Sequence, residues 1–317
     1  MTGRAGRARS ARLALRTLLV LPLALAGVFL GSGVAAAHGS GGPGPEMHLP
    51  RIVELDPPVP GLSVAVIEGG ARLRIDNGTG DTVDVRPAVI GARAAEPVIA
   101  PGDTARWADP RVRAAAADPV PAEARRAWAV PLLVGDQLVL VRGEQTWPPP
   151  PASAPWWLAT LLAAVLAAVV GRRAVSRPGW APALALLTLT VAGGHVVHVL
   201  GSALLFEDRP LLGAVLGTAG PAVLAWAIAA LGCGLTLARR AYGPLLCALS
   251  GGLFALFSAF GGDAFSSPVL PFEWAPDLDR LTLVLTLGGG LGLFLTGLAA
   301  LARDPAAPPV PALDEPG

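Results

Sequence analysis

Residues 181–200 read APALALLTLTVAGGHVVHVL, an apolar run in which two histidines stand near the end. An α-helix of this length spans the hydrocarbon core of a bilayer, which is about 30 Å thick, so the run predicts a transmembrane helix. The composition of the whole chain agrees, because 53% of the residues are hydrophobic and only 15% are charged. These proportions are typical of a multi-span membrane protein and not of a soluble one.

Four further apolar runs predict additional spans. They lie at about 156–170, 211–237, 244–260 and 281–301. With the run at 181–200 they predict a bundle of five transmembrane helices within residues 153–302. The run at 211–237 is interrupted by Gly220-Pro221, and proline disturbs a helix because it lacks a backbone N–H.

Charges between the spans predict the orientation of the chain in the membrane. Arginines follow the first and third runs, for example at Arg172 and Arg239, and Arg303 follows the last. The other loops are acidic or balanced. Because positive residues mark the cytoplasmic side, the segment before the first span is predicted outside and the tail 303–317 inside.

The N-terminus carries a second, independent cue to location. Residues 1–16 hold five arginines and no acid, an apolar run follows at 18–31, and Ala35-Ala36-Ala37 comes next. This order predicts a secretory signal peptide at 1–37, cleaved so that His38 becomes the first residue. The alternative is an uncleaved membrane anchor. Both cues predict a multi-pass protein of the cytoplasmic membrane with an extracytoplasmic N-terminal domain.

Residues 38–152 are predicted to form this extracytoplasmic domain. Short runs such as RIVELD, LSVAVIE and ARLRID alternate with period two, and Gly69-Gly70 and Gly135-Asp136 are hairpin signals. The pattern predicts a small antiparallel β-sandwich, tethered to the first span by the stiff segment Pro148–Pro151. Asn77-Gly78-Thr79 matches a glycosylation sequon but is interpreted as a turn.

Two histidines in the predicted extracytoplasmic segment suggest a metal site. An N-terminal His38 offers its α-amino group and a ring nitrogen to one ion, a chelate that suits Cu(II). Met47 and His48 follow after a flexible Gly/Pro segment and are candidates for further ligands. The alternative is that these residues have no metal role.

The other two histidines, His195 and His198, are three residues apart and so share one face of a helix. They are candidates to chelate an ion on the same predicted outer side, because polar groups in a span are functional candidates by default. The alternatives are hydrogen bonds to loop carbonyls, or packing in which Gly193 and Gly194 let another helix approach.

No motif indicates an enzyme. GGGLGL at 288–293 follows no predicted strand, so it is interpreted as a helix-packing segment and not as a nucleotide loop. Cys233 and Cys247 lie in apolar runs and are predicted to be packing residues. The net charge of +1 argues against a nucleic-acid partner.

The layout resembles that of a group of uncharacterised multi-pass membrane proteins of high-GC bacteria with an exported β-domain. The resembling stretches are AAAHG at 35–39, LVGDQLVLVRGEQTWPPPP at 133–151 and SSPVLPFEWAPDLDRL at 266–281. More distantly it is similar in layout to CopC-type and CopD-type copper-resistance proteins, which implies copper handling outside the cytoplasmic membrane. The chain departs from them because residues 106–119 contain no histidine.

The sequence therefore predicts a non-enzymatic membrane protein of the cell envelope. Its predicted partners are the bilayer and a copper ion, with His38, Met47, His48, His195 and His198 as candidate ligands. The alternative is a structural or interaction protein whose β-domain docks another envelope protein without a metal.

Overall fold

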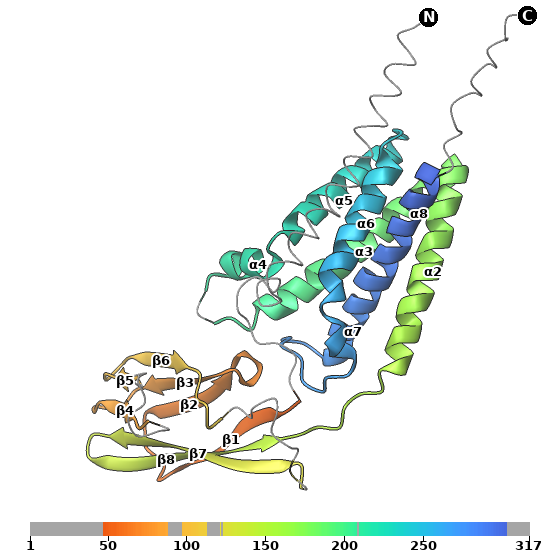
Figure 1. The fold of residues 1–317 in the computed structure, drawn as a ribbon. Coiled ribbons are helices and arrows are strands. Elements are labelled where there is room, and N and C mark those ends of the chain that lie inside the picture. Colours follow the sequence, from red (N-terminus) through yellow and green to blue (C-terminus); the bar gives the residue numbers. More distant parts are fainter. Residues whose placement is uncertain (1–46, 88–96, 113–120, 122, 208, 303–317) are drawn as a thin grey trace, which may run out of the picture.

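The computed structural model describes residues 47–87, 97–112, 121, 123–207 and 209–302. Strands occupy its first part, which we call the β-region (49–146), and helices its second, the helical bundle (154–302). Figure 1 shows the β-region at one end of the bundle, and we call this end proximal. The predicted signal peptide, His38 and the C-terminal tail lie outside the described residues.

The β-region contains two antiparallel sheets. The first has the order β1-β8-β7-β4-β5 and the second the order β2-β3-β6. The strands are β1 (Leu49–Asp56), β2 (Leu62–Ile67), β3 (Arg72–Asn77), β4 (Val83–Val85), β5 (Val98–Ile99), β6 (Thr104–Trp107), β7 (Arg125–Val134) and β8 (Gln137–Thr146). Both predicted hairpins are confirmed, since β2 pairs with β3 and β7 with β8.

Period-two alternation accounts for the core of the β-region. Leu73 and Ile75 in β3 are buried while their neighbours along the strand are only partly so. Val130 in β7 and Val139 in β8, on the other sheet, join the same hydrophobic cluster. The predicted antiparallel β-region is thereby confirmed, with both sheets contributing to one core.

Asn77 has a structural role at the end of β3. Its side chain is buried, and Nδ2 donates hydrogen bonds to the carbonyls of Asp81 (2.9 Å) and Ile99 (3.0 Å). Its Oδ1 accepts a hydrogen bond from the backbone N–H of Thr79. Because an Asx side chain commonly closes a turn in this way, the turn interpretation of the segment is confirmed.

The second half of the chain is helical. Its α-helices are α2 (Ala154–Ser176), α3 (Ala181–Ala203), α4 (Leu211–Ala219), α5 (Ala222–Leu237), α6 (Gly243–Ala259), α7 (Pro276–Leu283) and α8 (Gly290–Ala302). Three short 3-10 turns also occur in the described residues: η2 (Glu68–Gly70), η3 (Pro178–Trp180) and η4 (Gly262–Phe265). A π-helix, η5 (Val284–Gly289), joins α7 to α8.

The helices fit a lipid bilayer. In the part of the chain that the structure describes, three helical stretches are long and apolar enough to cross a membrane: Ala154–Ser176, Pro178–Ala203 and Pro276–Leu298. The count becomes four if α4 and α5 are taken as one span, but this pair is bent by 86° at Gly220-Pro221. Figure 1 shows α4 lying across the proximal end. Since α6 is shorter than these stretches, the total of five spans remains a prediction.

Glycines in GGGLGL (288–293) allow close helix packing, as predicted. A Cβ atom on Gly288 or Gly292 would lie 2.3 Å or 2.2 Å from a backbone carbonyl oxygen of α2. The alternative that Gly193 lets another helix approach is not supported, because a Cβ there would meet nothing within 4 Å among the described residues. A Cβ on Gly194 would make only ordinary contacts with Leu285.

Candidate functional site

A cluster of polar side chains occupies the proximal half of the bundle, where α3, α5 and α7 meet. Its members are His195 and His198 from α3, Trp226 from α5 and Asp279 from α7. Asp279 and His195 are each only 6% exposed. Buried polar groups are costly unless they find partners, so the bonds of this cluster determine what it does.

His198 is oriented by a carboxylate. Its Nδ1 lies 2.6 Å from Oδ1 of Asp279, whose side chain is 8% exposed, while that of His198 is 45% exposed. An ionised carboxylate only accepts hydrogen bonds, so the proton of a neutral His198 sits on Nδ1. Its Nε2 keeps a lone pair that is available to a metal ion or a proton.

His195 has the opposite tautomer. The indole Nε1 of Trp226 lies 3.2 Å from its Nδ1, and an indole N–H can only donate. The proton of a neutral His195 therefore sits on Nε2, which offers an N–H and not a lone pair. The two imidazole rings lie near each other, with centroids 6.3 Å apart. The shared face is confirmed, but a joint chelate requires His195 to release Trp226.

Arg280 fixes the loop that precedes this cluster. Its guanidinium is buried, with Nε donating to the carbonyl of Ala264 (3.0 Å) and Nη2 to that of Ser267 (2.7 Å). Its Nη1 donates to Asp277 at 2.7 Å. Arg280 thereby ties residues 262–267 to α7 and holds the helix that carries Asp279. Neither Asp279 nor Arg280 is among the ligands predicted from the sequence.

The remaining predicted ligands do not complete a metal centre in the described residues. Met47 is exposed, whereas His48 is buried with its ring centroid 5.7 Å from that of Trp147. Within the described ranges no group of three or more His, Cys, Asp or Glu side chains is placed to hold a metal ion. His38 lies outside those ranges.

The β-region contacts the proximal end of the bundle through an ion pair and through the turn that contains Gly69. Arg74 of β3 forms an ion pair with Glu207, which follows α3, and this bond is the main reason that the pKa of Arg74 is raised. Gly69 in η2 lies against Pro271, since a Cβ on it would be 3.7 Å from that residue. Within the bundle, the backbone N–H of Glu273 donates to the carbonyl of Gly201 in α3 at 3.0 Å.

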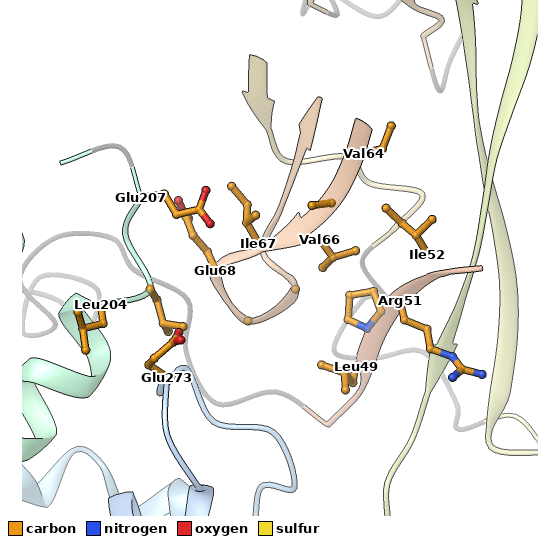
Figure 2. A pocket seen from close by; sticks show the side chains of 15 residues that line it. Leu49, Arg51, Ile52, Val64, Val66, Ile67, Glu68, Leu204, Glu207 and Glu273 are labelled. Atoms are coloured by element: carbon orange, nitrogen blue, oxygen red, sulfur yellow. The ribbon is translucent and has the colours of Figure 1, made fainter. Parts of the chain in front are cut away.

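A cavity of about 550 Å³ lies at this contact (Figure 2). It is lined by β1, β2 and η2 from the β-region, and by Leu204, Leu205, Glu207 and Glu273 from the bundle. Sequence reasoning missed it, because it exists only where two distant segments of the chain come together. The weak available signal was the acidic character of the loops that contain Glu207 and Glu273.

Comparisons with protein-family models, with curated proteins and with solved structures found no match to this chain. The functional conclusion therefore depends on the side-chain arrangement at the proximal end.

Proposed function

We propose that the chain is a non-enzymatic, five-span membrane protein of the cell envelope that binds a copper ion on the extracytoplasmic side. Its β-region, folded as a sandwich, lies outside the cytoplasmic membrane and its C-terminus inside. The arginines after α2 and α5 support this orientation. The observation that carries the metal proposal is the bond between His198 and Asp279.

A histidine held by a carboxylate through one ring nitrogen resembles metal ligands in proteins. Such ligands almost always donate their second ring N–H to a carboxylate, a carbonyl or water, which fixes the ring and raises its basicity. Imidazole is a suitable ligand for copper. His198 meets these conditions, and its side chain is 45% exposed. The proposal takes further ligands from His195 and from the N-terminal set His38, Met47 and His48.

The test is a Cu(II) titration of the full-length protein in neutral detergent, followed by electron paramagnetic resonance. His198→Ala removes a nitrogen ligand, and Asp279→Asn removes the group that orients it. We expect both to weaken binding, the second by about 10- to 100-fold, as outer-shell substitutions typically do. Glu54→Gln, an exposed change in β1, is the control and is expected to leave the affinity unchanged. Unchanged affinity in His198→Ala would contradict the proposal.

The second candidate function is docking of an envelope partner by the β-region without a metal. It is favoured by the engagement of two candidate ligands with tryptophans, since His48 packs on Trp147 and His195 accepts from Trp226. Replacing all four histidines distinguishes the two functions. A loss of growth under copper stress supports copper binding, whereas unchanged growth favours docking.

A further inference from the structure

The cavity between the β-region and the bundle has two kinds of wall (Figure 2). One wall, from β1 and β2, is apolar. On the side of β2 that faces the bundle its apolar side chains are Ala65 and Ile67, and β1 contributes Leu49. On the opposite side, Figure 2 shows the carboxylates of Glu68, Glu207 and Glu273. A site with this division suits a ligand that has an apolar part and a cationic part.

The charges on the walls do not cancel. Glu207 pairs with Arg74, and buried Glu68 lies 3.4 Å from Arg72. The carboxylate of Glu273 is exposed, and in the described part of the chain it has neither an ion pair nor a side-chain hydrogen bond. Arg51 also lines the cavity, but it donates to Glu144. A negative charge at Glu273 is therefore left for a ligand to neutralise.

The cavity lies where a membrane surface is expected. Leu204 and Leu205 line it and directly follow α3, which belongs to a stretch long and apolar enough to cross a bilayer. The end of a spanning helix lies at the level of the lipid headgroups. Leu204 is 41% exposed, so an apolar chain can approach along the end of α3.

We propose that this cavity binds a cationic amphiphile, with its ammonium group at Glu273 and its alkyl chain against Leu49, Ala65 and Ile67. The volume of about 550 Å³ falls within the range of small-molecule sites. An ammonium group forms an ion pair as well as a hydrogen bond with a carboxylate, whereas an alcohol offers only the hydrogen bond and a carboxylate ligand is repelled. The same chemistry is offered by an amine-bearing lipid of the membrane and by a soluble long-chain amine. This site uses none of the proposed copper ligands.

The first arm of the test varies the head group of the ligand. Full-length protein in neutral detergent is titrated with dodecylamine, dodecanol and dodecanoate, which share one alkyl chain. We expect dodecylamine to bind at least about tenfold more tightly than dodecanol, one carboxylate contact being worth roughly 1.4 kcal/mol. Glu273→Gln is expected to abolish this preference. Asp136→Asn, an exposed change in the β7–β8 turn, is expected to retain it. A preference that survives Glu273→Gln overturns the proposal.

The second arm fills the apolar part of the cavity. Ala65→Trp places a large side chain on a residue that lines it, whereas Ser63→Trp makes the same change at an exposed position of the same strand. We expect only Ala65→Trp to prevent dodecylamine binding, and equal binding by both variants contradicts the site.

Mass spectrometry of lipids that copurify with the protein then identifies the source of the ligand. An amine-bearing lipid that is lost in Ala65→Trp indicates the membrane. Its absence beside intact dodecylamine binding indicates a soluble amine. Either source of the amine is consistent with the proposed site, which the two titration experiments test.

Discussion

Replacement of Arg280 by alanine is expected to destabilise the proximal end of the bundle by about 2–6 kcal/mol, because two buried carbonyls would each lose a partner at a cost of roughly 1–3 kcal/mol. Arg280 is only 4% exposed, so water does not replace it readily. The carbonyls of Ala264 and Ser267 would each lose a charge-assisted hydrogen bond. The loop that contains them would then separate from α7.

Tryptophan fluorescence during thermal unfolding in detergent measures this effect. Phe265 in the loop packs against Trp156 and Trp157, with ring centroids 6.2 Å and 5.0 Å apart, so loosening of the loop changes the indole environment. Asp277→Asn is the control, because Asp277 is 77% exposed and its ion pair contributes at most about 1 kcal/mol. Similar small losses in both variants would show that Arg280 does not hold the loop.

Gly292→Ala is expected to destabilise the bundle by about 1–3 kcal/mol, as overpacking of a close-packed interface does. The added Cβ would lie 2.2 Å from the carbonyl oxygen of Ala164 and 2.6 Å from Cβ of Ala167, both in α2. A backbone carbonyl cannot rotate away as a side chain can, so α2 and α8 must move apart.

A matched glycine-to-alanine substitution elsewhere in the bundle is expected not to destabilise it. Gly193→Ala in α3 adds the same methyl group at a position where none of the described residues lies within 4 Å of it. Alanine favours a helix over glycine by about 1 kcal/mol, so this variant is expected to be as stable as the parent or slightly more stable. The measurement is a comparison of the thermal unfolding temperatures of Gly292→Ala and Gly193→Ala in the same detergent. Destabilisation by both would mean that glycine is needed for reasons other than helix contact.

Periodicity predicted most of the elements, because strand and helix patterns depend on neighbouring residues. The run at 181–200 became α3 (Ala181–Ala203) with little change in its bounds. Period-two alternation and turn glycines found the β2–β3 and β7–β8 hairpins. The run at 211–237 became two helices at a sharp bend, since Gly220-Pro221 ends α4 instead of merely kinking it.

The sequence predicted the two histidines of the candidate site but not the side chains that bind them. Spacing placed His195 and His198 on one face, but their partners Trp226 and Asp279 lie 31 and 81 residues away. Pairing at such separations depends on how helices pack, and a local pattern does not contain this. The burial of Arg280 is not predictable from its position in a charged loop for the same reason.

The unequal lengths of the helices have a consequence for the surrounding lipid. At 1.5 Å per residue, α2 and α3 with 23 residues each are about 35 Å long, while α5 and α6 with 16 and 17 are about 24–26 Å long. A hydrocarbon layer of about 30 Å is too thin for the first pair and too thick for the second. If α5 and α6 cross the membrane as proposed, α2 and α3 would tilt and the bilayer would thin beside α5 and α6, so that the protein would impose a gradient of thickness on its annular lipids.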